Sequence, residues 1–278
     1  MKKGLVIIVV FLFTVIAFGQ QKERIKGSKI VTVEQKEIGE FENLDVKDNL
    51  EIFLIKGDKC GVEIEADDNL HETIDVTLKD KTLYLSTTKL VSGAKKYSIR
   101  ITYTDNFKMA IAKDNANITA LAEITLTNFT FKIHDNAKLF ANVTTKSFTL
   151  MTDDKSKTEL NLKSDETIIE MSKNSQLKAL IASTQMKFDM YQKATATIEG
   201  DVIDLKLRLD NNSDFTGIKL TSKNTELVTE GYSQCSVTVN GKVSIDAKGK
   251  SEIHLYGEQK IDMKNFLDSA TLIKKALK

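Results

Sequence analysis

Three histidines are the first residues of this 278-residue chain to consider for catalysis or metal binding. His71, His134 and His254 lie far apart, and none forms a ligand-spaced pair with another His or with a Cys. His134 and His254 alternate with apolar residues in strand-like runs, so we expect their side chains to point outward. We interpret each histidine as a solvated surface residue rather than as a ligand.

A second candidate is the run Gly231-Tyr-Ser233-Gln-Cys235, which resembles the nucleophile elbow of serine hydrolases. Its fifth residue is Cys where the motif requires Gly. The repeat described below places Ser233 at a corner and Cys235 in the core, where a Cys behaves as a small hydrophobe. An oxidising compartment would permit a disulfide between Cys60 and Cys235, but a core position leaves Cys235 badly placed to reach Cys60.

Acidic residues form a third pattern, since three Asp occupy equivalent positions in successive repeats. That position holds, in order, Asp114, Asp135, Asp154, Lys173, Gln192 and Asn211. The mixture is typical of a turn rather than of a carboxylate site. A calcium ladder is the alternative, although the glycine-rich nonapeptide of calcium-binding solenoids is absent.

The remaining acidic pairs, Asp67-Asp68 and Asp153-Asp154, fall in expected turns, where acidic residues are common. No phosphate loop or nucleotide fingerprint occurs in the chain. We therefore predict no catalytic, cofactor-binding or metal-binding residue.

The elements that would position these residues repeat about every nineteen residues between Met109 and Gly257. The clearest copy is Phe131–Ala141, in which alternating apolar residues flank the polar turn Asp135-Asn136. One small residue follows each turn: Ala116, Ala137, Ser156, Ser175, Ala194, Ser213, Ser233 and Ser251. A fixed period in this range predicts repeated units stacked along one axis.

Apolar residues recur six and four positions before each small residue and two and four positions after it. The alternation within each arm is typical of strands, and Asn, Asp or Gly before the small residue suits a sharp corner. Nineteen residues are too few for a strand–helix–strand unit of about thirty residues, but they suffice for one rung of a parallel β-helix. A β-sandwich of hairpins would explain the alternation but not columns that persist through eight copies.

Composition excludes some functions. The net charge is +1 with both signs mixed along the chain, so no basic surface for nucleic acid or anionic lipid is expected. Trp is absent and aromatic residues make up 7%, so a stacking platform for sugars or bases would be thinly supplied. The absence of Pro suits strands that must all donate into ladders.

Residues 1–19 are predicted to be a secretory signal peptide. Lys2 and Lys3 precede the apolar run Leu5–Phe18, and Ala17-Phe18-Gly19 provides a small-residue cleavage site. An uncleaved anchor is the alternative, although the run is shorter than the roughly 20 residues that span a bilayer. We expect an exported protein, in the periplasm or at the cell surface, that contacts the membrane only through this leader.

Residues 20–37 are predicted to be a polar lead-in, and strands follow it up to Tyr103. This segment lacks the nineteen-residue period, so we expect antiparallel pairing, with a hairpin turn at Lys79-Asp80-Lys81 and a mobile loop at Leu90–Lys96. After Gly257 the apolar residues follow a helical spacing, which predicts an amphipathic helix over 258–278. We expect this helix to cap the open end of the solenoid; a helix that binds a membrane surface or a partner is the alternative.

The chain also resembles a known family through several short motifs. They are Phe41-Glu-Asn-Leu44-Asp-Val46, Leu50-Glu-Ile52, Ile55-Lys-Gly57-Asp58, Val62-Glu-Ile64-Glu, Asp68-Asn69-Leu70, Leu83-Tyr-Leu85 and Ile253-His-Leu255-Tyr256-Gly257. Over 38–257 the sequence is similar to exported proteins with the auto-transporter adhesin head GIN domain. The resemblance implies a right-handed β-helix-like fold, a role in adhesion at the surface or in the periplasm, and no established catalytic residues. The family's corners are commonly Ser-Gly-rich, whereas here only Gly231 and Gly249 keep a Gly, so a function of a Gly-rich corner face is in doubt.

These observations together predict a non-enzymatic, exported β-solenoid that serves as a structural or binding surface for a glycan or a protein at the cell envelope. One alternative is a carbohydrate-active β-helix enzyme, which would need Asp or Glu to converge with Lys or Arg in a cleft. The other is a periplasmic assembly partner that docks through the C-terminal helix.

Overall fold

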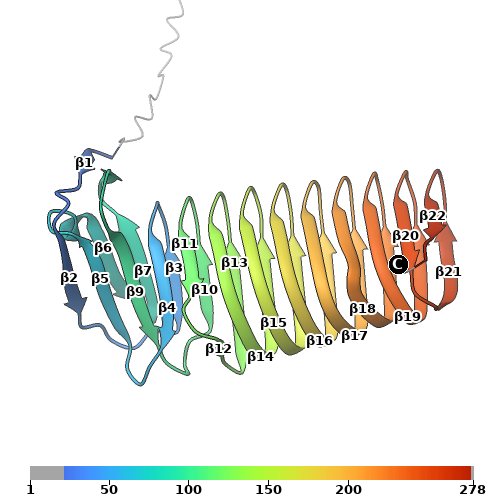
Figure 1. Ribbon diagram of the computed structural model, residues 1–278, viewed down its shortest axis with the longest axis horizontal. Coiled ribbons are helices and arrows are strands. Elements are labelled where there is room, and N and C mark those ends of the chain that lie inside the picture. The colour runs from blue at the N-terminus through green and yellow to red at the C-terminus, as the bar shows by residue number, and fades with distance from the viewer. Residues whose placement is uncertain (1–21, 277–278) are drawn as a thin grey trace, which may run out of the picture.

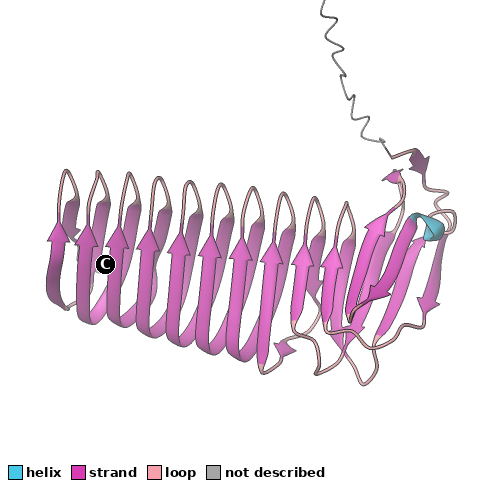
Figure 2. Cartoon of the chain, turned by 180° about the vertical axis from the view of Figure 1, so that it is seen from behind, coloured by secondary structure: helices cyan, strands magenta, loops and turns pink. Residues whose placement is uncertain are grey.

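The computed structural model describes residues 22–276, in which every regular element is a strand apart from one 3₁₀ turn, η1 (His71–Thr73). The strands stack into a long solenoid, and the single helical turn lies near the N-terminal end (Figures 1 and 2). The predicted signal peptide 1–19 and the start of the lead-in lie outside the described residues. Within 22–276, no helix has the length and apolar character needed to span a bilayer.

Six long strands form the regular part of the solenoid, and each supplies one rung. They are β14 (Lys138–Thr152), β15 (Lys157–Met171), β16 (Gln176–Met190), β17 (Thr195–Leu209), β18 (Asp214–Thr229) and β19 (Gln234–Ala247). Neighbouring rungs are parallel and in register, so that Leu139 pairs with Thr158 and Thr158 pairs with Leu177. The predicted solenoid and its period of about nineteen residues are confirmed.

The alternation of buried and exposed residues changes phase near the middle of each long strand, which marks a bend there. In β15, Asp165 and Glu166 are consecutive exposed residues between two alternating stretches. A rung therefore has two arms, one that follows a corner and one that precedes the next corner. We call their outer surfaces the post-corner face and the pre-corner face.

The corners are four-residue turns such as Asp153–Ser156, and their second residue adopts a left-handed backbone conformation. These residues have φ between 54° and 75°: Asp48, Asp114, Asp135, Asp154, Lys173, Gln192, Asn211, Gly231, Gly249 and Asp268. The following N–H donates to the preceding corner, as Lys155 N does to Asp135 O at 2.7 Å and Asn174 N to Asp154 O at 2.8 Å. This ladder offsets the cost of positive φ even at Lys173 and Gln192, where the residue type does not favour it.

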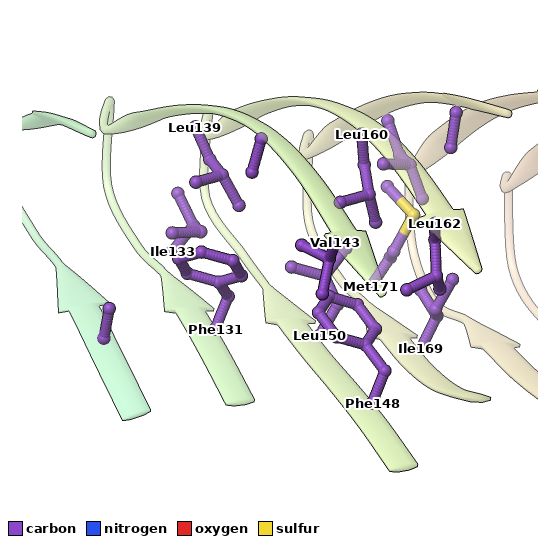
Figure 3. Close-up of a cluster of buried hydrophobic side chains, with 14 of the residues drawn as sticks. Phe131, Ile133, Leu139, Val143, Phe148, Leu150, Leu160, Leu162, Ile169 and Met171 are labelled. Atoms are coloured by element: carbon purple, nitrogen blue, oxygen red, sulfur yellow. The ribbon is translucent and has the colours of Figure 1, made fainter. Parts of the chain in front are cut away.

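The apolar columns fill the interior of the solenoid. Figure 3 shows side chains from successive rungs, among them Phe131, Leu150 and Ile169, stacked in one buried cluster. Aromatic rings extend this stack, with the centroids of Phe129 and Phe131 4.7 Å apart in an edge-to-face arrangement. One rung cannot bury its own inward face, so each rung is stabilised by the rungs on both sides.

The rungs on the N-terminal side of β14 are built from shorter strands. β13 (Asn128–Ile133) pairs with the second half of β14, β10 (Met109–Ala112) pairs with β13, and β11 (Asn117–Ala120) pairs with the first half of β14. The two-residue β12 (Ile124–Thr125) also pairs with β14, at Val143 and Thr144.

One further rung lies beside the rung of β10 and β11, although the two are far apart in sequence. β3 (Asn43–Val46) and β4 (Glu51–Lys56) pair in parallel with β10 and β11 on one side, and with β7 (Thr82–Thr87) and β9 (Tyr97–Tyr103) on the other. The strands β3 and β4 thus lie between rungs that both come later in the chain (Figure 1). Their corner, Asp48-Asn49-Leu50, has the same form as Asp114-Asn115-Ala116.

Antiparallel strands complete the N-terminal end. The antiparallel pairing expected before Met109 is therefore confirmed only in part, since β3 and β4 in the same segment pair in parallel. β5 (Gly61–Asp67) pairs with β9, β2 (Val31–Lys36) pairs with β5, and β6 (Ile74–Lys79) forms the predicted hairpin with β7. The expected loop Leu90–Lys96 instead contains β8 (Leu90–Ser92), which pairs with β1 (Arg24–Lys26) of the lead-in. The Asp67 carboxylate holds the rest of this segment through the backbone N–H groups of Lys95 and Lys96.

The predicted C-terminal helix is wrong. Residues 258–276 continue the solenoid with β21 (Lys260–Phe266), which pairs with β19, and β22 (Thr271–Lys274), which pairs with β20 (Glu252–Tyr256). Asp268-Ser269-Ala270 forms one more corner, and Ala270 follows Ser251 by the usual nineteen residues. The apolar residues fit both periodicities, and pairing to an existing rung satisfies backbone groups that an added helix would leave open.

Candidate functional site

The histidines do not form a site. His134 Nδ1 lies 3.1 Å from Asp153 Oδ1, and His254 Nε2 lies 2.7 Å from Glu252 Oε1; both rings are partly exposed on the outside, as predicted. His71 is buried, so its interpretation as a solvated residue is wrong. Its Nε2 lies 2.8 Å from Thr32 Oγ1, in a contact between η1 and β2. The three rings lie on separate parts of the solenoid.

The resemblance to a nucleophile elbow is structural only. Ser233 is fully buried at a corner, and Cys235 is 2% exposed among core side chains. Burial raises the pKa of the Cys235 thiol far above its ordinary value, which removes the thiolate that a nucleophile needs. Cys60 is only partly buried, and both thiols are free. The predicted core position of Cys235, on which the argument against a disulfide depends, is confirmed.

The aspartate column belongs to the corners, as predicted. Asp114 Oδ2 accepts a hydrogen bond from the backbone N–H of Asp48 at 3.0 Å, and Asp135 Oδ2 accepts one from Asp114 at 2.9 Å. Asp154 pairs with Lys173 Nζ at 2.8 Å, and this hydrogen bond lowers the pKa of Asp154. No group of three His, Cys, Asp or Glu within 22–276 has the arrangement of a metal site.

A row of buried hydroxyl groups was not predicted. At the bends, Ser164 Oγ lies 2.5 Å from Thr167 Oγ1, which lies 2.9 Å from Ser183 Oγ, and Ser222 Oγ lies 2.7 Å from Thr225 Oγ1. The signal for it is a Ser or Thr about eight residues after the small corner residue. Because these hydroxyls satisfy one another, the row stabilises the bends. Ser164, Ser183 and Ser222 also line a hollow on the surface at the bends.

The post-corner face carries three adjoining hollows, of about 480, 390 and 600 Å³, along β14–β18. The first and second share Asn142, Asn161 and Leu180 as lining residues. The second and third share Thr144, Lys163, Ala182 and Asp201. They therefore form one continuous depression from Phe140 to the bends, which we call the post-corner groove.

The post-corner groove combines apolar and amide surfaces. Phe140 and Leu180 are exposed although both are large and apolar. Between them, Asn161 Nδ2 donates to Asn142 Oδ1 at 2.7 Å, so two amides of neighbouring rungs pair within the groove. Apolar surface beside amide donors and acceptors suits an extended ligand with both hydroxyl groups and carbon–hydrogen faces.

The pre-corner face carries a separate hollow of about 960 Å³ over β15–β19 and β21. Acidic and basic side chains meet here, and several of them pair with one another: Lys206 Nζ with Glu226 at 3.6 Å and Lys264 Nζ with Asp262 at 3.0 Å. Asp204 Oδ1 accepts a hydrogen bond from Asn224 Nδ2 at 2.8 Å. The hydrogen bond from Lys264 lowers the pKa of Asp262, the opposite of what a general acid needs.

Comparison with known proteins identifies the family rather than a ligand. Residues 40–258 match the family described as "Putative auto-transporter adhesin, head GIN domain". None of the functionally curated proteins matches this chain.

Solved structures share the fold at low sequence identity. An adhesin from Parabacteroides merdae, described as putative, superposes with a TM-score of 0.68 at 14% identity and covers 92% of this chain and 100% of its own. One from Parabacteroides distasonis, described in the same way, gives 0.65 at 17% identity, covering 91% and 98%. A protein from Parabacteroides distasonis described as a "Putative lipid binding protein" gives 0.63 at 12%, covering 91% and 100%. At these identities the likeness establishes the fold alone.

Proposed function

Because the chain belongs to the auto-transporter adhesin head GIN family, we propose that it is an exported, non-enzymatic solenoid that binds a glycan strand along the post-corner groove. The observation that supports this function is the continuity of the groove, whose three hollows share lining residues across β14–β18. Many weak contacts spread over successive rungs suit a polymer better than a small molecule.

The chemistry of the groove favours a glycan over a charged polymer. The Asn142–Asn161 pair offers amide donors and acceptors to hydroxyl groups, and Phe140 offers an aromatic surface to a sugar ring. Lys163 and Asp201 both line the overlap of the second and third hollows, so neither sign of charge dominates there.

The pairing of charges argues against a hydrolase site on the pre-corner face, which supports a binding role without turnover. Glycoside hydrolysis requires two carboxylates beside the scissile bond, one of which stays protonated. On the pre-corner face, the carboxylates of Glu226 and Asp262 already face lysines. An assay that detects polysaccharide cleavage by the purified protein would contradict the non-enzymatic assignment.

Export is tested separately. The proposal requires removal of residues 1–19, so the protein from the cell envelope should begin at Gln20 when its N-terminus is sequenced. A chain that keeps Met1 and fractionates with the cytoplasm would contradict it.

The groove is tested with a glycan array followed by titration of the strongest glycan against variants. The double variant Phe140→Ala and Leu180→Ala should weaken binding at least about tenfold, because both side chains leave the groove. Ile168→Ala is the matched control, since Ile168 is an exposed apolar residue of the pre-corner face. No glycan above background, or an equal loss in the control, would contradict the groove as the binding site; capture of a protein alone would replace the glycan.

A further inference from the structure

One aromatic side chain interrupts a polar column on the corner ridge. The residue between the left-handed position and the small residue is Asn49, Asn115, Asn136, Lys155, Asn174, Lys193, Asn212, Tyr232, Lys250 and Ser269 in successive corners. Tyr232 is the one aromatic residue in this column and is 60% exposed. Corner geometry does not require a ring there, since Asn, Lys or Ser forms the same turn at the other positions.

The Tyr232 ring lies against a side chain of the neighbouring corner. Lys250 Nζ, from the next corner, lies 5.4 Å from the ring centroid over one face. The residue is nevertheless 60% exposed, so part of the ring surface is open to solvent beside this contact. A ring held in this way presents a flat apolar surface at low entropic cost.

The ring lines a hollow of about 340 Å³ beside the corners between β17 and β20. Polar side chains surround it: Asn212, Asp214, Gln234, Lys250 and Glu252. This volume is at the lower end of the range for small-molecule sites. We call the hollow the Tyr232 pocket; it shares no lining residue with the post-corner groove.

Most polar groups of the Tyr232 pocket are uncommitted. Within 22–276, the side chains of Asn212, Asp214 and Gln234 and the Tyr232 hydroxyl make no hydrogen bond to the protein, whereas Glu252 pairs with His254. Partial desolvation raises the pKa of Asp214, although its side chain remains exposed to solvent. On the pre-corner face, by contrast, charged groups already pair with one another.

We propose that the Tyr232 pocket binds a single neutral hexopyranose, with the sugar ring stacked on the exposed surface of the Tyr232 ring and its hydroxyls bonded to Asn212, Asp214 and Gln234. An aromatic face beside amide and carboxylate groups matches the alternating apolar faces and hydroxyl edges of a pyranose. Asp214 and Glu252 outnumber Lys250, so a uronic acid is disfavoured. The pocket is a second site, and its assignment does not rest on the function proposed for the groove.

The test is a titration of the mature protein with methyl glucoside, methyl galactoside, methyl mannoside and glucuronate, followed by saturation-transfer NMR and chemical shifts. At least one neutral glycoside should bind with saturation, and glucuronate should bind more weakly. Tyr232→Ala should weaken binding at least about tenfold, while Tyr232→Phe, which keeps the ring, should bind within about twofold of wild type. Tyr84→Ala is the matched control, because Tyr84 is 40% exposed on β7 and lies outside the pocket.

Three results would overturn the proposal: no neutral glycoside binds, glucuronate binds as well as the neutral sugars, or Tyr232→Ala binds like wild type. Unfolding of the Tyr232 variant is not a concern for this test, since an exposed ring can be removed without opening the core. The groove variants Phe140→Ala and Leu180→Ala should leave this monosaccharide binding unchanged, which separates the two sites.

Discussion

Glu42 Oε2 accepts a hydrogen bond from Lys108 Nζ at 2.5 Å, although the two residues are 66 positions apart in the chain. Glu42 Oε1 accepts a second one from Lys81 Nζ at 2.6 Å. The three residues flank β3, β10 and β7, so the carboxylate joins rungs whose order in space differs from their order in sequence. Side-chain hydrogen bonds from Lys108 and Lys81 lower the pKa of Glu42 to about 2.

We predict that Glu42→Gln reduces the dependence of stability on acid pH. A carboxyl whose folded pKa lies below its ordinary 4.5 contributes stability above that pH, and the contribution is lost as the pH falls towards 2. The Glu42 side chain is 23% exposed, so solvent screening limits the expected fall in Tm at neutral pH to a few degrees. Thermal unfolding from neutral to acid pH should show the two curves converging; parallel curves would contradict the prediction.

Asp67, like Glu42, joins segments that are far apart in sequence, in this case at the N-terminal end of the solenoid. Its side chain is 0% exposed and accepts backbone N–H groups from Lys29 at 2.8 Å and from Lys95 and Lys96 at 3.0 Å. Burial by itself raises the pKa of Asp67, but these N–H groups lower it by more, and the net pKa is below its ordinary value. Its stabilisation is therefore present at neutral pH and is lost in acid.

Asp67→Asn should lower Tm by roughly 5–10 °C, because the amide replaces one acceptor oxygen with a donor that faces other donors. Amide hydrogen exchange should accelerate first at Lys29, Lys95 and Lys96. The exposed neighbour Asp68 supplies the control, and Asp68→Asn should cost much less. Equal losses in the two variants would show that the buried acceptor is not responsible.

Gly200 has a conformation that another residue cannot adopt. Its φ is 115°, and a Cβ atom there would lie 2.1 Å from Ile181 O in the neighbouring rung. Gly200→Ala should therefore destabilise the protein by about 2–4 kcal/mol in urea unfolding. Gly93→Ala is the control: its φ is 59°, but its Cβ would meet nothing closer than 3.9 Å, so a cost of only about 1 kcal/mol is expected. Similar costs for both would indicate that the close approach in the rungs relaxes easily.

The two thiols should differ in reactivity. In the folded protein a maleimide should label Cys60, which is partly buried, at least about tenfold faster than Cys235, whose pKa burial raises. In denaturant without reductant both should label, since neither is in a disulfide. Mass spectrometry of the labelled peptides checks this; rapid native labelling of Cys235 would mean that the rung around it opens.

Much of the solenoid could be predicted because each regular rung repeats the same sequence pattern, in which alternating apolar residues flank a polar corner. The columns that contain Leu150 and Leu139 required only alternation and a constant interval, and both residues are buried. The corner at Asp154 could be recognised from residue type. The corners at Lys173 and Gln192 could be placed only by their interval from neighbouring corners, because the hydrogen-bond ladder between rungs, and not the side chain, sets their backbone.

Two rungs were not predicted, although both have the apolar offsets and the corner of a regular rung. One is formed by β3 and β4, and the other by β21 and β22. Leu44, Val46, Ile52 and Leu54 stand at the standard offsets from Leu50, but the next corner is 66 residues away. At the C-terminus, Asp268-Ser269-Ala270 fits the interval, yet the apolar residues around it also fit a helix. Local periodicity could not choose between these structures, because the choice depends on which partner strand is free.

The candidate sites were harder to predict than the rungs. The post-corner groove depends on which outward residues of several rungs lie side by side, as Asn142 and Asn161 do at an interval of nineteen. Tyr232 was placed in the discarded hydrolase motif, and only the stacking of corners brings Lys250 and Asn212 beside it. Low aromatic content predicted that a stacking platform would be thinly supplied, and the proposed sugar site accordingly uses a single ring.

The position of β3 and β4 between later rungs has a consequence for how the chain reaches its native state. These strands have no parallel partner until residues 82–120 have been synthesised, so the N-terminal end must assemble through contacts of high sequence separation. Each later rung pairs with the rung formed about nineteen residues earlier in the chain. We expect one slow nucleation event over 43–120, followed by rapid growth toward the C-terminus, and a chain emerging from a translocation channel would follow that same direction.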